Sequence, residues 1–178
     1  MAGMPDVIDR APRLILRRWS REDADDLFDM ASDPSLGEDA GWRPHRTPED
    51  SLEAIDGVLS KDGVYAIVSR ANGRPVGCIE LDRDPKILRK GPKDAEVGFW
   101  IGSRYRNQGF AREALETVIA AAEENGVSRI WARCYEGNEA SVHVLSVCGF
   151  RFDHRSLSEN DYTGEVAVCV FLRKRNGR

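Results

Sequence analysis

Residues 95–126, AEVGFWIGSRYRNQGFAREALETVIAAAEENG, predict a strand, then a turn that contains glycine, then a helix. Residues 96–101 mix alternating and continuous apolar character, which is typical of a largely buried strand. Asn125 and Gly126 tolerate the left-handed conformation and predict where the helix ends. The helix itself is predicted because apolar residues recur on one helical stripe, namely Ala111, Ala114, Leu115, Val118, Ile119 and Ala122.

The turn between this strand and this helix has the features of an anion site. A helix N-terminus offers backbone N–H groups without intrahelical partners and carries partial positive charge. Gly109 allows an anion to approach the backbone, and Ala111 keeps the first turn narrow. Arg106 and Arg112 flank the turn and can pair with phosphates. The turn contains neither GxGxxG nor the GK[ST] ending of a P-loop, which disfavours a nucleotide hydrolase.

The spacing Arg106-x-x-Gly109-x-Ala111 resembles the acyl-CoA pyrophosphate loop of the GNAT family of N-acetyltransferases, whose pattern is Gln/Arg-x-x-Gly-x-Gly/Ala. Its flanks add to the resemblance: the strand before it, the long helix after it, and later the short sequences NEAS and CGF. The series is similar to the GNAT subgroup that contains the RimJ and RimL protein N-terminal acetyltransferases. The resemblance covers roughly residues 12–173.

The resemblance implies an α/β fold with a central, splayed mixed sheet of about seven strands flanked by about four helices. Acetyl-CoA, the expected co-substrate, would lie in the cleft between the strand at residues 96–101 and a strand at residues 129–134. The helix that connects these two strands makes a right-handed crossover.

Length and composition agree with one globular domain. The 178 residues are 41% hydrophobic and 31% charged, and we expect a flexible arm over residues 1–11, one domain over residues 12–173 and a tail over residues 174–178. No apolar run reaches about 18 residues. Residues 1–11 lack the basic and apolar regions of a signal peptide. We therefore expect no membrane partner and a cytoplasmic location.

The net charge, the cysteines and the histidines limit which partners and cofactors we expect. The formal net charge of −4 argues against a nucleic-acid partner. The four cysteines contain no CxxC pair and are predicted to be reduced core residues, with a catalytic thiol as the alternative. The three histidines show no ligand spacing, so we expect no metal.

Two helix starts are predicted before the central stretch. Ser20 with Asp23 resembles a capping box. Thr47 as N-cap and Pro48 as the first helical residue begin a second helix. Residues 33–46, which lie between these helices, are predicted to be a loop.

Asn72-Gly73 is a strong two-residue hairpin signal. It joins predicted strands at residues 63–69 and 75–81. The remaining predicted elements are strands at residues 13–19, 129–134, 150–152 and 166–172, and a short helix at residues 138–148.

The resemblance assigns acetyl-CoA contacts to two parts of the chain. Backbone N–H groups at Phe99, Trp100 and Ile101 would polarise the thioester carbonyl. Asn138 would contact the CoA arm or the acetyl region, and it is also a good helix N-cap. The loop and the first helical turn would hold the pyrophosphate, through Arg106, Asn107, Gln108, Gly109, Phe110, Ala111 and Arg112.

An amine attacks a thioester only when it is unprotonated, so the site must remove a proton, stabilise an oxyanion and protonate the leaving thiolate. By the resemblance Glu96 would be the general base, and the alternative is a structural pair with a basic side chain. Many GNAT enzymes use a tyrosine as the thiolate's proton donor, but Leu145 occupies that position here. The subgroup suggests Ser141 as the substitute, and an ordinary helix serine is the alternative.

The acceptor side of GNAT proteins is covered by the region of the first two helices. This makes Glu38, Asp39, Trp42 and His45 candidate substrate contacts. The alternative is a solvated loop in which Trp42 is only a packing anchor.

The expected reaction is direct acetyl transfer, in a ternary complex, to a primary amine: either the N-terminal α-amine of a protein or a small-molecule amine. A non-catalytic acyl-CoA sensor is the alternative, which the missing tyrosine keeps open. GNAT proteins are often dimers, so a homodimer is one expected state.

Overall fold

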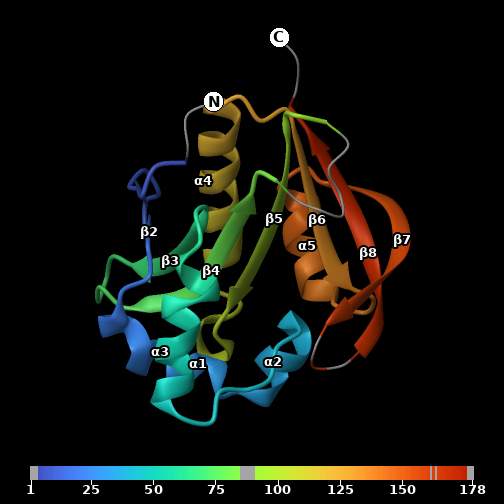
Figure 1. Cartoon of the computed structure of the whole chain (residues 1–178). Coiled ribbons are helices and arrows are strands. Elements are labelled where there is room, and N and C mark those ends of the chain that lie inside the picture. Colours follow the sequence, from blue (N-terminus) through green and yellow to red (C-terminus); the bar gives the residue numbers. More distant parts are fainter. Residues whose placement is uncertain (1–3, 85–90, 161, 163, 176–178) are drawn as a thin grey trace.

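A computed structural model describes residues 4–84, 91–160, 162 and 164–175, which form a mixed sheet with helices on both faces (Figure 1). In this part of the chain the sheet has eight strands, against the expected number of about seven. They are β1 (Val7–Ile8), β2 (Leu14–Arg17), β3 (Val64–Ser69), β4 (Pro75–Asp82), β5 (Asp94–Ile101), β6 (Arg129–Tyr135), β7 (Arg151–Asn160) and β8 (Gly164–Lys174). Their order across the sheet is β1-β2-β3-β4-β5-β6-β8-β7. Only β5 and β6 are parallel among these pairs, so the predicted mixed sheet is confirmed.

The described residues form five α-helices: α1 (Ala24–Ala31), α2 (Pro34–Ala40), α3 (Pro48–Asp56), α4 (Phe110–Glu124) and α5 (Glu139–Val147). Successive side chains of β3 point to opposite faces of the sheet, and each face is covered by its own hydrophobic cluster. Ile67 lies in the hydrophobic cluster with α4 and α5, whereas Ala66 lies in a second cluster with α1, α2 and α3. In α4 the predicted stripe is buried at Ala114, Leu115 and Val118.

The predicted helix starts are present, and so is the hairpin, but its connection spans residues 70–74 and is not the two-residue turn that Asn72-Gly73 predicted. Ser20 and Asp23 form a capping box at a short 3-10 turn, Arg21–Asp23, that leads into α1. Thr47 caps α3 in the same way, with Pro48 as the first helical residue. β3 and β4 are joined through Gly73, whose φ of 71° lies in the left-handed region.

The prediction of a loop over residues 33–46 is wrong in its first half, where α2 forms. The Asp33 side chain caps this helix by accepting a hydrogen bond from the Ser35 N–H at 2.9 Å. Gly41 ends it in the left-handed conformation. Leu36 is the one large apolar side chain that α2 buries, so a helix this short leaves no apolar periodicity in the sequence.

The two ends of the sheet also differ from the prediction. Val7 and Ile8 pair with β2, and both Met4 and Ile8 are buried, so this part of the expected arm belongs to the sheet. β7 begins at Arg151 as expected but extends to Asn160. Its polar residues pair along β8 at the sheet edge, where outward side chains need not be apolar. Of the predicted tail, residues 176–178 lie outside the described residues.

β5 and β6 pair along only part of their length. Their register runs from Asp94–Arg129 to Val97–Ala132. Beyond that point β5 stays on β4 and β6 stays on β8, so the two strands diverge (Figure 1). Within the described residues, the edge of positions 98–101 that faces β6 has no strand partner, so this edge is open to a ligand.

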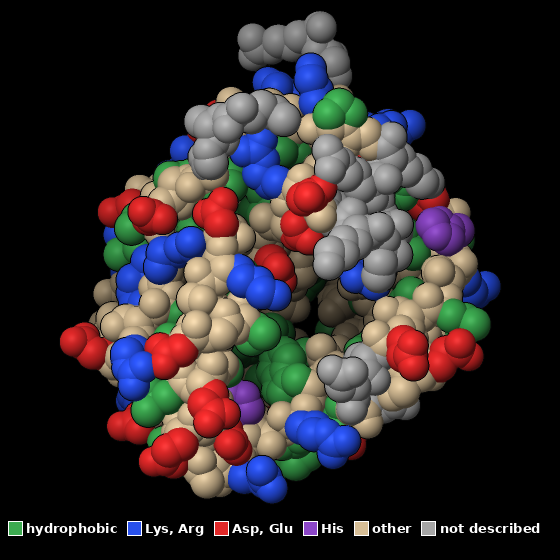
Figure 2. Space-filling view, in the orientation of Figure 1, with side chains coloured by type: hydrophobic (Ala, Val, Ile, Leu, Met, Phe, Trp, Pro, Cys, Tyr) green, Lys and Arg blue, Asp and Glu red, His purple; other side chains and the backbone are tan. Residues whose placement is uncertain are grey.

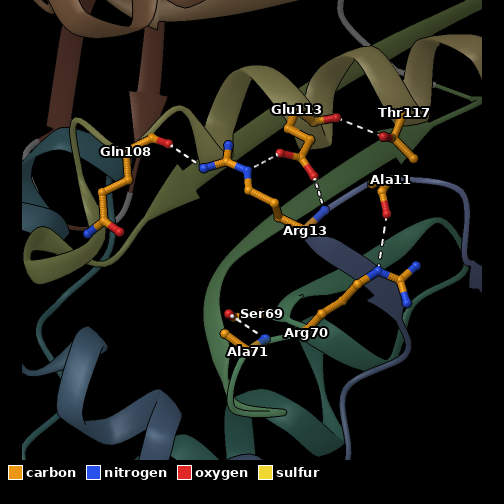
Figure 3. Close-up of polar contacts among 8 residues, drawn as sticks. All are labelled: Ala11, Arg13, Ser69, Arg70, Ala71, Gln108, Glu113 and Thr117. Atoms are coloured by element: carbon orange, nitrogen blue, oxygen red, sulfur yellow. Dashed lines mark hydrogen bonds and ion pairs between the residues drawn. The ribbon is translucent and has the colours of Figure 1, made fainter.

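Arg13, which immediately precedes β2, holds the loop that precedes α4 (Figure 3). The Glu113 carboxylate accepts hydrogen bonds from the Arg13 backbone N–H and from its Nε, each at 2.7 Å. The same guanidinium donates to the Gln108 carbonyl at 2.9 Å and lies 4.9 Å from the centre of the Phe110 ring. The Thr117 hydroxyl donates to the Glu113 carbonyl at 2.7 Å. The start of α4 is therefore fixed by a residue distant in sequence.

Replacing Glu113 by alanine should lower the free energy of unfolding by about 1–2 kcal/mol, because two Arg13 donors lose a charged acceptor. Urea unfolding measures this loss. Glu116→Ala is the matched control: its pair with Arg112 lies on the same helix with side chains 50% and 59% exposed, and exposed pairs contribute about 0–1 kcal/mol. Equal losses in the two variants would mean that the Arg13–Glu113 contact is no stronger than a surface pair.

Candidate functional site

A cavity of about 450 Å³, which we call the loop cavity, lies between the end of β5, the loop before α4 and the first turns of α4 and α5. The structure brings together here nearly all of the residues that were predicted to contact acetyl-CoA. Gln108 is the exception: its side chain donates to the Arg104 carbonyl at 3.4 Å and does not line the cavity. Those that do line it are Phe99, Trp100, Ile101, Arg106, Asn107, Gly109, Phe110, Ala111, Arg112 and Asn138.

The backbone at the start of α4 is open toward the loop cavity. Gly109 is the N-cap with φ 80°, and Asn107 also has a positive φ, of 62°. A glycine has no side chain to cap the helix, so the first-turn N–H groups stay available to an anion. A Cβ added at Gly109 would lie 3.4 Å from the guanidinium of Arg13. That distance is an ordinary contact, so it is the positive φ that favours glycine at this position.

The two arginines expected to bind phosphate already have carboxylate partners. Arg106 donates to the Asp39 carboxylate at 3.1 Å and to the Ile101 carbonyl at 3.4 Å. Arg112 pairs with Glu116 one turn further along α4 at 2.8 Å. Both guanidiniums remain partly exposed, at 37% and 59% of their side-chain area. Exposed pairs of this kind are weak, so a phosphate can compete for the arginines.

A second cavity of about 550 Å³, which we call the strand cavity, lies on the other side of the β5 terminus. Its wall is the sheet face that carries Glu80, Asp82 and Glu96. The Glu96 carboxylate pairs with Arg133 on β6 at 2.6 Å, and Arg133 also donates to the Ser158 hydroxyl at 3.2 Å. The structure therefore contains the pair with a basic side chain that the sequence left as the alternative for Glu96.

The two cavities meet at a shared wall made by Asp39, Ala40, Phe99, Trp100, Asn138 and Ser141. Asn138 caps α5 by accepting the Ser141 N–H at 3.0 Å. In the described part of the chain the Ser141 hydroxyl has no hydrogen-bond partner of its own. Leu145 is only 1% exposed and belongs to the core, away from both cavities. Figure 2 shows the molecule hollowed where β5 and β6 diverge, with hydrophobic side chains in the hollow and charged ones around it.

The candidate substrate contacts are only partly brought together. Asp39 lines both cavities, and Trp42 lines the strand cavity while its ring packs edge-on against Trp100 at 5.3 Å. Glu38 is exposed and lines neither cavity. His45 also lies outside both; its Nδ1 is hydrogen-bonded to the Ser51 hydroxyl at 2.8 Å, and burial lowers the pKa of its imidazole.

Sequence reasoning missed three residues of the site. Arg133 lies on the same face of β6 as Trp131, and the parallel register brings that face beside Glu96. Glu80 is a single charged residue in the otherwise apolar run PVGCIEL, which was a readable signal. No local pattern in the sequence indicates the role of Arg13, because that role depends on a contact with Glu113, which is distant in the chain.

Cys78 and Cys134 line the strand cavity, and Cys148 lies in the core. Burial raises the pKa of Cys78 to about 12 and that of Cys134 and Cys148 to about 11, so these thiols stay protonated near neutral pH. Over residues 4–84, 91–160, 162 and 164–175, no group of His, Cys, Asp and Glu side chains could hold a metal ion. None of the described helices combines the length and apolar character that crossing a membrane requires.

Comparison with known proteins agrees with this geometry. A family model of the GNAT acetyltransferase domain matches residues 13–151. The uncharacterized N-acetyltransferase YoaA of Bacillus subtilis is 28% identical over 145 residues, which cover 78% of this chain and 80% of that protein.

Two solved structures show the same fold. RimL, a ribosomal α-N-protein acetyltransferase in complex with coenzyme A, has a TM-score of 0.75 at 17% identity and covers 94% of this chain and 97% of its own. The ribosomal-protein-alanine N-acetyltransferase of Brucella melitensis has a TM-score of 0.69 at 19% identity, with 90% and 99% covered. Because the family model spans most of the sequence, this chain belongs to the GNAT family of N-acetyltransferases.

Proposed function

We propose that this enzyme transfers the acetyl group of acetyl-CoA directly to a primary amine in a ternary complex. The observation that carries the proposal is the meeting of the two cavities at Phe99, Trp100 and Ser141. A thioester that enters through the loop cavity and an amine that enters through the strand cavity would reach one another there. Holding both reactants in place makes the attack effectively unimolecular.

The loop cavity suits the coenzyme. The first-turn N–H groups of α4 would bind the pyrophosphate, with Arg106 and Arg112 at its sides. The unpaired edge of β5 would hydrogen-bond the pantetheine arm, much as a strand would. The N–H groups near Phe99 to Ile101 would polarise the thioester carbonyl and stabilise the oxyanion that forms.

Ser141 would protonate the departing thiolate. It lines both cavities, and its hydroxyl is not engaged by any described residue. Leu145 has no proton to give and is buried. On the other side of the reaction, a carboxylate of the strand cavity would receive the proton of the amine, with Glu96 as the sequence-based candidate.

The acceptor is a primary amine of either class, the α-amine of a protein or a small molecule. An α-amine, with a pKa of about 8, loses its proton far more readily than a lysine amine of about 10.4. Two proteins of the same fold are described as ribosomal-protein acetyltransferases. Both considerations favour an N-terminal α-amine, and we propose it as the first acceptor class to test.

The test combines binding and turnover in one sample. Acetyl-CoA is titrated into the purified chain by calorimetry, and thiol release is then followed with a library of N-terminal peptides and a panel of polyamines. We expect binding, followed by thiol release with peptides. Release with the polyamines alone would overturn the α-amine assignment. Binding without release in either panel would contradict the proposed acceptor classes.

Gly109→Glu should abolish acetyl-CoA binding without unfolding the chain. The change adds bulk and negative charge where the pyrophosphate would lie, next to the Arg13 guanidinium. Gly73→Glu is the matched control, because Gly73 also has a positive φ, of 71°, and nothing lies within 4 Å of an added Cβ. Both variants should share the backbone strain, of order 1 kcal/mol, that a side chain suffers there. Binding that survives in Gly109→Glu would remove the pyrophosphate from this loop.

Asp39→Asn should tighten acetyl-CoA binding by up to about fivefold, because it releases Arg106 from a pair that contributes about 1 kcal/mol at most. The gain should shrink as salt is added, since the pair is partly exposed. Glu38→Gln removes the same charge from the same helix at a residue outside both cavities. A weaker affinity in Asp39→Asn would show that the Asp39–Arg106 pair helps to bind the coenzyme rather than competing with it.

A further inference from the structure

Glu80 lies on β4, beside the part of β5 at which the two cavities meet. In the register of β4 and β5 it is directly opposite Gly98, and Glu96 and Trp100 are its diagonal neighbours on the same face. Gly98 is exposed and has open space where a Cβ would be. The Glu80 side chain therefore faces the strand cavity beside the backbone at which the two cavities meet.

The other carboxylates of the strand cavity are engaged. Glu96 accepts from Arg133 at 2.6 Å, Asp39 accepts from Arg106 at 3.1 Å, and Asp82 accepts the backbone N–H of Asp84 at 2.8 Å. Glu80 has no hydrogen bond or ion pair with any residue that the structure describes. An ammonium group entering the cavity can thus take Glu80 as a partner without breaking an existing contact.

We infer that Glu80, rather than Glu96, is the carboxylate that binds the acceptor ammonium and takes its proton. This inference rests on the proposed acetyl transfer and assigns one step of it. The Glu96 carboxylate would have to leave Arg133 before it could bind the ammonium. An unpaired carboxylate on a rigid strand meets no such cost.

The electrostatic surroundings of Glu80 agree with this role. The Glu80 side chain is exposed to the open cavity, and partial desolvation by the surrounding walls raises the pKa of its carboxyl, with the negative charge of Asp82 adding to the rise. Lys61 opposes it, and Glu96 raises the pKa slightly further. A carboxyl with a raised pKa retains a transferred proton better than an ordinary glutamate does. The charged side chains that line the cavity around Glu80 are Asp39, Lys61, Asp82, Glu96 and Arg133.

The acceptor ammonium gives one proton to the Glu80 carboxylate and becomes a neutral amine. Its nitrogen lone pair forms the C–N bond to the thioester carbonyl carbon, and the carbon–sulfur bond breaks with its electron pair on sulfur. The thiolate takes a proton from the Ser141 hydroxyl and leaves as coenzyme A. The second amine proton passes through solvent to Ser141 and restores its hydroxyl, and Glu80 gives its own proton to water, so one proton is released per turnover.

The experiment measures kcat/KM against pH for the full chain, with acetyl-CoA and an accepted amine of known pKa. Glu80→Gln should lower kcat/KM at neutral pH by about 100-fold and leave the KM for acetyl-CoA within about twofold. It should also abolish the fall in rate at low pH that reflects protonation of Glu80. Glu96→Gln keeps the candidate base and should retain that fall.

Asp82→Asn supplies a readout that does not depend on the folding of the Glu80 variant. Asp82 raises the pKa of Glu80, so its neutralisation should move the low-pH fall in rate to lower pH. A purely structural effect would leave the position of the fall unchanged. In the wild-type chain, a carboxyl-carbon NMR titration should place the Glu80 midpoint above the usual range of a glutamate carboxyl.

The inference is overturned if Glu80→Gln keeps the wild-type pH profile while Glu96→Gln loses it. In that case acetyl-CoA binding and turnover by the wild type would still support the proposed function. If the wild-type chain neither binds acetyl-CoA nor releases thiol, the proposed function fails and this inference fails with it. The two failures are distinguished by the wild-type titration, which precedes every variant.

Discussion

The partial pairing of β5 with β6 is the constraint on which the rest of the structure depends. Parallel strands that stay paired leave no edge open, and a ligand could not reach their backbone. Here the pairing ends at Val97 and Ala132, because each strand then follows its antiparallel neighbour on the other side. The divergence exposes backbone groups at the centre of the sheet and lets two cavities meet there. Strand register, rather than any single side chain, makes transfer between two substrates geometrically feasible.

The charges around this divergence are organised as pairs that link different elements. Arg106 joins the loop to α2 through Asp39, Arg133 joins β6 to β5 through Glu96, and Arg13 joins β2 to α4. Each pair positions one wall of the site, and the pairs differ in exposure and therefore in strength. The Asp39–Arg106 contact is the more exposed and can open for a ligand, whereas Glu96 is only 16% exposed. Within this arrangement the unpaired Glu80 differs from the other carboxylates.

The sequence predicted helices and strands correctly where both an apolar pattern and end signals were present. The apolar stripe from Ala111 to Ala122 corresponds to α4, and the capping residues Ser20 and Thr47 precede the helices that they predicted. α2 was missed although Asp33, Pro34 and Gly41 are typical residues for the two ends of a helix. The helix buries only one large apolar side chain, so no apolar periodicity supported those end signals. β7 was cut short because an edge strand carries polar residues, which give no apolar alternation.

The sequence by itself determined the family, the strand–loop–helix that forms the loop cavity, and most of the residues that line it. The strand, loop and helix depend on residues close together in the chain, so spacing and propensity predict them, whereas the family and the lining residues came from the resemblance of Arg106, Gly109, Ala111 and their flanks to the GNAT pattern. Only the tertiary structure decided which charges meet. Arg133 pairs with Glu96 across 37 positions, and Asp39 with Arg106 across 67. Such contacts follow from register and from the packing of separate elements, which leave no local pattern in the sequence.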